Sequence, residues 1–345
     1  MRVALVSTLS TPVRRHGSGS VEGLVWLLSR ELTARGHEVT VFAAAGSEPV
    51  GRLVAALRGT YGQNGVPDDW QACEWINLCR AAEMSDRFDV VHSHAYLYGL
   101  PLHNVFRCPT VHTMHVQGGE GYAKLWQAFP DARVTAISRH QWSAFPSLRP
   151  VAIIPHGVDE SQFTFRAEPE DYLCFLGRFM PGKGVVEAIN AARELGVRLR
   201  LAGPSNEYFE QQVKPLMDGR NVEFVGWVAG AERDRLLGGA RALLYPQQHP
   251  EPFGLVQVEA MMCGTPVAAV GIGAVPEIVE EGVTGALAAH GAPFAPAIER
   301  AMRLDRRRVR ETAVGRFPAS RMTDGYEAVY RQAVEAGAAG RTGAR

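Results

Sequence analysis

The sequence predicts an α/β protein made of two doubly wound parallel sheets, and three observations support this. Short β-branched runs alternate with helical patterns from the first residue onward, as in βαβ units. The alternation restarts with a second series of strands after Pro155-His156-Gly157. The chain has 345 residues, which is more than a single hydrophobic core usually organises. We therefore expect two domains, each with its own core.

The predicted strands fall into two series, and the helix after the first strand has an apolar face formed by Val21, Leu24, Val25, Leu28 and Leu32. The first series is Val3–Val6, Val39–Ala43, Asp89–His92, Thr110–Thr113 and Val134–Ile137. The second is Tyr172–Leu176, Arg198–Ala202, Val222–Val225, Ala242–Tyr245 and Pro266–Val270.

The polar segment 159–171 lies between the two series, as expected of a linker. We predict an N-terminal domain over residues 1–158, a second domain over 159–316, and a C-terminal helix and tail over 317–345. The helical pattern extends to about Ala336, and residues 338–345 are predicted to be frayed.

The composition excludes several classes of partner. Lys plus Arg and Asp plus Glu both total 36, so the net charge of +0 gives no general attraction to nucleic acid or anionic lipid. The five cysteines are scattered without a Cys-x-x-Cys pair, which favours neither zinc nor redox chemistry and is typical of a reducing cytoplasm. No apolar stretch approaches the roughly 20 residues of a membrane span. We expect a cytoplasmic protein without a transmembrane segment.

A glycine-rich segment that follows a strand is the first candidate site, because open α/β sheets bind ligands beyond the carboxyl ends of their strands. Gly177-Arg178-Phe-Met-Pro-Gly-Lys183-Gly184 follows the strand Tyr172–Leu176 and precedes a helix near Val185. Its glycines allow close approach of the backbone, and its two cations suit a diphosphate. For an isolated loop of this kind, two ordinary solvated charges in a turn are the commoner outcome.

The second candidate is Glu251-Pro-Phe253-Gly254-Leu255, which continues to Glu259. Gly254 is predicted to begin a helix whose N-terminal amides favour an anion. On one regular helix the two glutamates would lie roughly 80° off a common face. With Glu251 on the preceding loop, both carboxylates could accept hydrogen bonds from hydroxyl groups of one ligand. The alternative is a solvated helix face with a capping carboxylate.

Two further segments are less specific. His92, His94, His112 and His115 lie on or just after strands, but no nearby carboxylate completes a metal site, so hydrogen bonding, or core packing for His92, is favoured over metal binding. The connection Ser7–Ser20, with Arg14 and Arg15, could approach an acceptor or a phosphate, or be a flexible surface loop.

Together these segments resemble the retaining glycosyltransferases of family four, which have the GT-B fold. The strongest element is Glu251-Pro-Phe-Gly-Leu, followed by Glu259-Ala-Met and by Cys-Gly-Thr-Pro266-Val, which is similar to the family's E-x7-E signature. Supporting elements occur in family order: Arg35–Val41, Asp89–His92, Ile154–Asp159 with Phe163, Gly177-Arg178 with Lys183-Gly184, and Pro276–Val279. The resemblance implies two Rossmann-like domains facing a central cleft, with a C-terminal helix that crosses back to the first domain.

The resemblance also implies roles for individual residues. Arg178 and Lys183 would bind the donor diphosphate and stabilise charge on the leaving group, Glu259 would bind ribose, and Glu251 would bind the transferred sugar. His115 would lie beside that sugar, with His112 as the rival assignment. The remaining donor-binding residues are Gly19, Gly177, Phe253, Gly254 and Leu255. Gly19-Ser20 stands where the family often has Gly-Gly.

The predicted function is retaining, metal-independent transfer of a hexosyl-type sugar from a UDP- or GDP-sugar to a hydroxyl of a soluble small molecule or glycan. The mechanism would be front-face substitution without a cofactor, in a monomer or weak dimer. Two alternatives remain: a 2-epimerase or sugar-phosphate synthase of the same fold, and a catalytically idle sugar-nucleotide binding protein. A Rossmann dehydrogenase is disfavoured, because the glycine spacing after the first strand is wrong and no acid ends the second strand.

Overall fold

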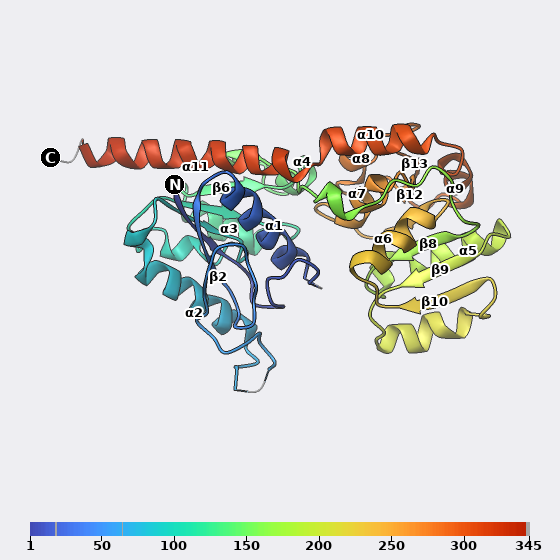
Figure 1. Cartoon of the computed structure of the whole chain (residues 1–345), viewed down its shortest axis with the longest axis horizontal. Helices are drawn as coiled ribbons and strands as arrows, with labels where there is room; N and C mark the ends of the chain where they lie inside the picture. The colour runs from blue at the N-terminus through green and yellow to red at the C-terminus, as the bar shows by residue number, and fades with distance from the viewer. Residues whose placement is uncertain (18, 64, 343–345) are drawn as a thin grey trace. The chain divides into compact units, whose positions relative to one another are not determined.

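The computed structural model describes residues 1–17, 19–63 and 65–342 (Figure 1). The chain divides into two compact units: unit 1 comprises Met1–Gly157 and Ala319–Arg345, and unit 2 comprises Val158–Pro318. Each unit contains its own parallel sheet and its own hydrophobic core. The predicted fold class, two doubly wound α/β sheets, is confirmed.

Unit 1 contains a seven-stranded parallel sheet in the order β3-β2-β1-β4-β5-β6-β7. Its strands are β1 Arg2–Val6, β2 Glu38–Phe42, β3 Arg52–Val54, β4 Val90–Ser93, β5 Thr110–Thr113, β6 Arg133–Ala136 and β7 Ala152–Ile153. Its helices are α1 Ser20–Ala34, α2 Trp70–Glu83, α3 Glu120–Gln127, α4 Arg139–Ser143 and α11 Ala319–Thr342. The strand order reverses direction between β1 and β4, so the carboxyl ends of these two strands flank the crevice in which such sheets bind ligands.

Unit 2 contains a six-stranded parallel sheet in the order β10-β9-β8-β11-β12-β13. Its strands are β8 Leu173–Leu176, β9 Leu199–Ala202, β10 Val222–Gly226, β11 Leu243–Tyr245, β12 Val267–Val270 and β13 Gly285–Ala288. Its helices are α5 Val185–Glu194, α6 Gly230–Gly239, α7 Leu255–Met262, α8 Val275–Ile278, α9 Ala295–Ala301 and α10 Arg306–Arg316. Here the order reverses between β8 and β11, which places the switch point beside the two predicted donor segments.

Segment 159–171 is part of unit 2, and the interpretation of this segment as a linker is wrong. Asp159 caps a short 3₁₀ helix, and the amide of Thr164 donates to Asp234 Oδ1 at 2.7 Å. The amide of Arg166 donates to the Cys263 carbonyl at 3.2 Å. The polar residues therefore serve turns and caps on a packed segment rather than an extended connection. The compact units divide after Gly157 and after Pro318, compared with the predicted 158 and 316.

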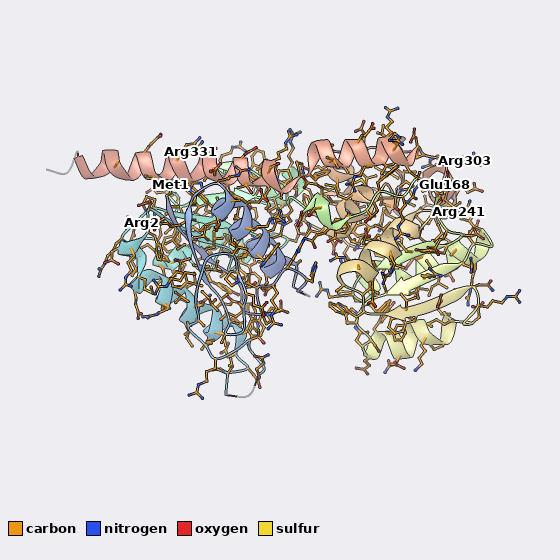
Figure 2. All side chains as sticks on the ribbon, viewed as in Figure 1. Met1, Arg2, Glu168, Arg241, Arg303 and Arg331 are labelled. Carbon is orange, nitrogen blue, oxygen red and sulfur yellow. The ribbon has the colours of Figure 1, made fainter. Side chains whose placement is uncertain are left out.

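The C-terminal helix α11 is longer than predicted and belongs to unit 1. Residues 338–342 continue the helix instead of fraying, and 343–345 lie outside the described residues. Charged side chains of both signs extend from each unit, among them Arg2 and Arg331 in unit 1 and Glu168 and Arg303 in unit 2 (Figure 2). This mixture agrees with the absence of net charge in the sequence.

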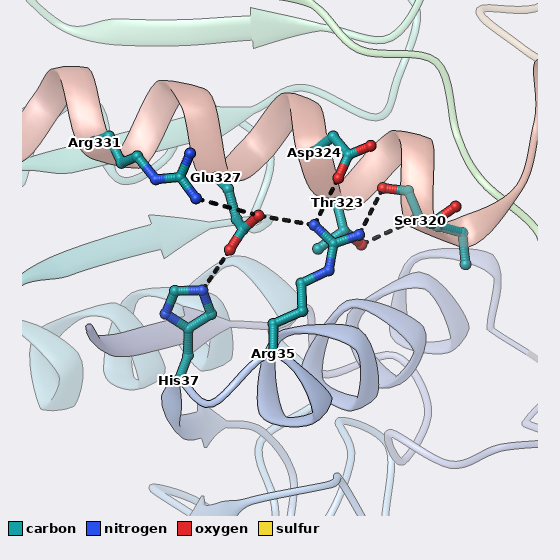
Figure 3. A network of polar contacts seen from close by, with 8 residues as sticks. Arg35, His37, Ser320, Thr323, Asp324, Glu327 and Arg331 are labelled. Atoms are coloured by element: carbon teal, nitrogen blue, oxygen red, sulfur yellow. Dashed lines mark hydrogen bonds and ion pairs between the residues drawn. The ribbon is translucent and has the colours of Figure 1, made fainter.

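A group of ion pairs, which we call the α11 network, joins α11 to the turn between α1 and β2 (Figure 3). Arg35 Nη1 lies 2.7 Å from both Asp324 Oδ1 and Glu327 Oε2, and its Nη2 donates to the Ser320 carbonyl at 2.9 Å. His37 Nε2 lies 2.6 Å from Glu327 Oε1. Burial by itself raises the pKa of Glu327, but the hydrogen bonds from His37 and Arg35 outweigh it and hold that pKa below its usual value.

We expect Glu327→Ala to weaken the packing of α11, because it leaves Arg35 and His37 without their shared carboxylate. The loss should be about 1–3 kcal/mol, seen as faster amide hydrogen exchange in 319–342. Asp324→Ala is the control: its side chain is 69% exposed, and such pairs contribute about 1 kcal/mol or less. Since the pKa of Glu327 is lowered by folding, its contribution is present above the unfolded pKa and is lost as the pH falls through the folded value. Equal exchange in the two variants at neutral pH would contradict the prediction.

Candidate active site

The carboxyl ends of β8 and β11 bring two predicted donor segments together in unit 2. The segment after β8 contains Gly184 at φ 71°, where an added Cβ would lie 1.8 Å from the Pro246 carbonyl oxygen. The amide of Gln248 donates to the Gly182 carbonyl at 2.9 Å. Only glycine permits this approach at 184, so the two loops are held in direct contact at the switch point. α5 begins at Val185, as predicted.

Lys183 and Glu251 form an ion pair across these loops. Their side chains are 15% and 24% exposed, and the hydroxyl of Tyr245 also donates to Glu251 Oε2. Burial and then the charge of Arg178 lower the pKa of Lys183 to about 8. Lys183 is therefore not an ordinary solvated charge, whereas Arg178 is exposed, as the alternative interpretation expected. Gly177 lies at the end of β8, where its amide donates to the Ala202 carbonyl at 3.0 Å.

A third connection, after β12, packs against the backbone of Glu251. The amide of Ala274 donates to the Glu251 carbonyl at 3.1 Å. A Cβ on Gly273, at φ 63°, would lie 2.7 Å from the Glu251 amide nitrogen. The loops after β8, β11 and β12 thus fix the position of one carboxylate.

Gly254 begins α7, as predicted, from a left-handed conformation with φ 97°. Among the described residues, no side chain caps this end of the helix, and an added Cβ at Gly254 would lie 2.4 Å from Gln257 Nε2 and 2.5 Å from the Tyr245 hydroxyl. Phe253 is 2% exposed and packs edge-on against Phe317, so only its backbone is available to a ligand. Leu255, the first helical residue, is half-buried. The turn exposes backbone groups where an anion is favoured.

Glu259 lies in the second turn of α7 and is 7% exposed, so it is not part of a solvated helix face. Its carboxylate pairs with Arg233 of α6. Burial raises the pKa of Glu259, and the charge and hydrogen bond of Arg233 oppose that rise. Arg233 was not predicted from the sequence; its place in the first turn of the helix after β10 is the signal that could have indicated it.

Two predicted site residues, Gly19 and His115, belong to unit 1. Gly19 precedes α1, and an added Cβ there would lie 2.0 Å from Glu22 Oε2. Glu22 is 2% exposed and accepts hydrogen bonds from the Thr8 hydroxyl and from the amides of Ser10 and Thr11, at 2.9–3.1 Å. In the described part of the first loop, the buried carboxylate of Glu22 therefore orders the backbone. A freely flexible surface loop would lack such hydrogen bonds. Ser18 lies outside the described residues.

The histidines of unit 1 occupy two different environments. His92 is fully buried between the Tyr330 hydroxyl of α11 and the Thr113 hydroxyl, at 2.6 and 2.7 Å. His94 Nδ1 lies 2.9 Å from His115 Nε2, and the ring of His115 stacks on that of His156 at 5.2 Å. Burial lowers the pKa of His115 to about 3, which keeps its ring neutral at neutral pH.

His112, the alternative to His115 for the position beside the sugar, lies in a different environment. Its neighbour Thr113 faces His92, so His112 points to the opposite face of β5, where its Nε2 lies 3.2 Å from the Thr110 hydroxyl. His112 is fully buried, whereas His115 is half-buried. Within residues 1–17, 19–63 and 65–342, no three His, Cys, Asp or Glu side chains form a group suited to a metal ion.

Solved structures share this architecture. A glycosyltransferase involved in avilamycin A biosynthesis is 28% identical, with a TM-score of 0.74 over 97% of this chain and 98% of its own. A protein from Anabaena, solved with UDP-glucose, is 19% identical, with a TM-score of 0.74 over 96% and 100%. The two Rossmann-like units and this likeness place the chain in the GT-B fold, the architecture of these glycosyltransferases.

Sequence comparisons identify the family. Residues 159–314 match the family model described as glycosyl transferases group 1, and residues 21–162 match that of glycosyltransferase family 4. The D-inositol 3-phosphate glycosyltransferase of Mycolicibacterium smegmatis is 28% identical over an alignment that covers 83% of this chain and 79% of the relative. The chain belongs to the family-four glycosyltransferases.

Within the described residues, no helix is both long enough and apolar enough to cross a bilayer.

Proposed function

We propose that the protein transfers a hexosyl group, with retention of anomeric configuration and without a metal or other cofactor, from a nucleotide-diphosphate sugar to a hydroxyl of a small molecule or glycan. Unit 2 would hold the donor, and unit 1 would supply the acceptor site. The observation that carries the proposal is the Lys183–Glu251 pair at the β8/β11 switch point, beside the uncapped start of α7. It combines a cation, backbone amides and a carboxylate within reach of one donor.

The diphosphate would bind at Lys183 and Arg178, and the two cations would stabilise the charge that develops as it leaves. The bond from the anomeric carbon to the phosphate oxygen breaks, and its electron pair leaves with the nucleoside diphosphate. The acceptor oxygen bonds to the anomeric carbon on the same face, and its proton passes to the departing phosphate oxygen. Bound diphosphate would compete with Glu251 for Lys183, which frees the carboxylate for sugar hydroxyls.

The donor nucleoside would be held by Glu259, which accepts from ribose hydroxyls when it parts from Arg233. The UDP-glucose complex of the Anabaena protein supports a UDP-sugar as the first donor to test, with a GDP-sugar as the other candidate. His115, predicted from the family resemblance to lie beside the transferred sugar, is neutral and is positioned by His94 and His156. It would therefore act as a hydrogen-bonding group rather than as a cation.

A thermal-shift and hydrolysis screen against UDP-, GDP-, ADP- and TDP-sugars tests this function. We expect one nucleotide class to raise the melting temperature and to be slowly hydrolysed, without added divalent metal and in the presence of EDTA. Glu259→Gln should weaken donor binding about 10-fold or more, because a ribose hydroxyl loses a charged acceptor (about 1.5–3 kcal/mol). The exposed Glu187→Gln serves as the matched control. Binding without turnover would favour the idle binding protein, and no binding of any nucleotide would overturn the proposal.

A further inference from the structure

Three aromatic side chains meet at the carboxyl edge of the unit 1 sheet, and we call them the aromatic cluster: Trp70, Tyr96 and Tyr98. The ring centroids are 5.4 Å apart for Trp70 and Tyr96, 5.8 Å for Trp70 and Tyr98, and 5.4 Å for the two tyrosines. Trp70 is the first residue of α2, and the tyrosines follow β4, one of the two strands at the switch point. All three rings are half-buried, so each retains an accessible surface.

The backbone of the aromatic cluster is strained at Tyr96. Within the described residues, Tyr96 is the single non-glycine residue with positive φ, at 53°. Its amide donates to the His94 carbonyl at 2.9 Å, which closes a tight turn immediately after β4. A bulky residue in the left-handed backbone conformation costs on the order of 1–3 kcal/mol, and such residues concentrate at ligand-binding sites. The strain holds an aromatic ring at the position where a ligand of this sheet would bind.

A buried carboxyl group lies under the same crevice. Glu74 of α2 is fully buried, and its Oε1 accepts from the amide of Leu9, in the loop after β1, at 2.9 Å. Its Oε2 is buried and has no hydrogen-bond partner within the described chain, and the same holds for the hydroxyls of Ser7 and Thr11. Burial raises the pKa of Glu74 to about 8, so the group is protonated at neutral pH and can donate as well as accept.

The charges around the aromatic cluster do not suit a phosphate. Burial raises the pKa of Tyr96, and four acidic groups add to that rise: Tyr61, Glu74, Tyr122 and Glu22. In the neighbouring first loop, Arg14 donates to the Gly46 carbonyl at 3.0 and 2.8 Å and pairs with Glu48. Arg15 lies over the ring of Trp26, on α1. Aromatic faces beside neutral or acidic hydrogen-bonding groups favour a ring that carries hydroxyls and no charge.

We propose that the aromatic cluster is the acceptor subsite, and that it takes an uncharged polyhydroxylated ring, a neutral sugar or glycoside, whose apolar face stacks on Trp70 and Tyr96. This rests on the proposed function and narrows its acceptor class. The uncharged acceptor would distinguish this chain from its relatives named D-inositol 3-phosphate glycosyltransferases, whose name denotes a phosphorylated acceptor. Trp70 is a specificity residue in this proposal, with no part in the departure of the nucleotide.

The test compares neutral and phosphorylated acceptors with the donor found in the screen. Methyl α-glucoside, p-nitrophenyl β-glucoside and myo-inositol are set against glucose 6-phosphate and D-inositol 3-phosphate, and nucleotide release above the rate of hydrolysis is measured. We expect at least one neutral ring to be used with a KM about 10-fold or more below that of its phosphorylated counterpart. Use of phosphorylated acceptors alone would overturn the proposal. The proposal would also be overturned if every neutral ring failed both to react and to bind, as measured by saturation-transfer NMR with the nucleoside diphosphate of that donor present.

Variants of one helix separate stacking from folding. Trp70→Ala should raise the KM for the neutral acceptor about 10-fold, with unchanged donor hydrolysis and donor KM, and Trp70→Phe should restore most of the affinity. Trp75→Ala is the matched control, because Trp75 is also half-buried on α2 and lines the opposite side with Ala55 and Cys79. Equal effects of the two alanine variants would overturn the proposal. If wild-type donor binding and hydrolysis fail as well, the failure belongs to the proposed function.

Discussion

Replacement of Lys183 by methionine is expected to lower kcat/KM for the donor by about 10²–10³, or about 2.7–4 kcal/mol of transition-state stabilisation. Methionine keeps an unbranched apolar stem but removes the charge that would meet the leaving diphosphate. It also leaves Glu251 with the Tyr245 hydroxyl and without its cation. Lys214→Met is the control, because Lys214 is 60% exposed, lies in the same unit and pairs with the exposed Glu210. Steady-state kinetics and donor binding on both variants measure the difference.

The pH dependence of the same lysine has a definite sign. The pKa of Lys183 is lowered to about 8, so the ammonium is charged below that pH and neutral above it. We expect kcat/KM for the donor to fall as the pH rises through about 8, because this parameter reports the free enzyme. The corresponding fall in kcat should occur at a higher pH, since bound diphosphate stabilises the charged form of Lys183. Lys183→Arg should abolish the fall near pH 8, and a profile unchanged by that substitution would contradict the assignment.

The regular elements were predictable from the sequence because their signals are local. All ten predicted strands exist within one residue of their expected limits. The three strands that were not predicted are β3 Arg-Leu-Val, β7 Ala-Ile and β13 Gly-Ala-Leu-Ala. They are short and lie at the sheet edges, where pairing with a neighbour rather than sequence defines the strand.

The sites were predictable only in part, because they depend on contacts across the fold. The loop chemistry indicated Lys183 and Glu251, but their ion pair follows from the adjacency of β8 and β11 in the sheet. Arg233 reaches Glu259 from another helix, at a sequence separation of 26. The aromatic cluster likewise joins the start of α2 to the residues after β4. Spacing along the chain cannot reveal such neighbours without the strand order.

Unit 2 depends on a buried arginine that no sequence motif identified. Arg306, the first residue of α10, is 8% exposed, and burial lowers its pKa. Its guanidinium donates four hydrogen bonds, at 2.6–2.9 Å, to the carbonyls of Arg166, Gly238 and Ala240 and to the Thr265 hydroxyl. These acceptors belong to the segment mistaken for a linker, to the end of α6 and to the approach to β12. One side chain thus hydrogen-bonds to two separate stretches of backbone and to one hydroxyl group.

Arg306→Met should destabilise unit 2 by about 3–5 kcal/mol, because several buried oxygens lose charged donors that methionine cannot replace. For a unit of this size the melting temperature should fall by about 10 °C or more. Arg308→Ala is the control: Arg308 is exposed on the same turn of α10, and its loss should change stability by about 0.5 kcal/mol or less. Hydrogen exchange should localise the effect of Arg306→Met to 158–318, with unit 1 largely unaffected, because all four acceptors lie in unit 2. A small shift like that of Arg308→Ala would mean that water or a rearranged side chain satisfies these oxygens, and that the guanidinium is not what holds segment 159–171 to the rest of unit 2.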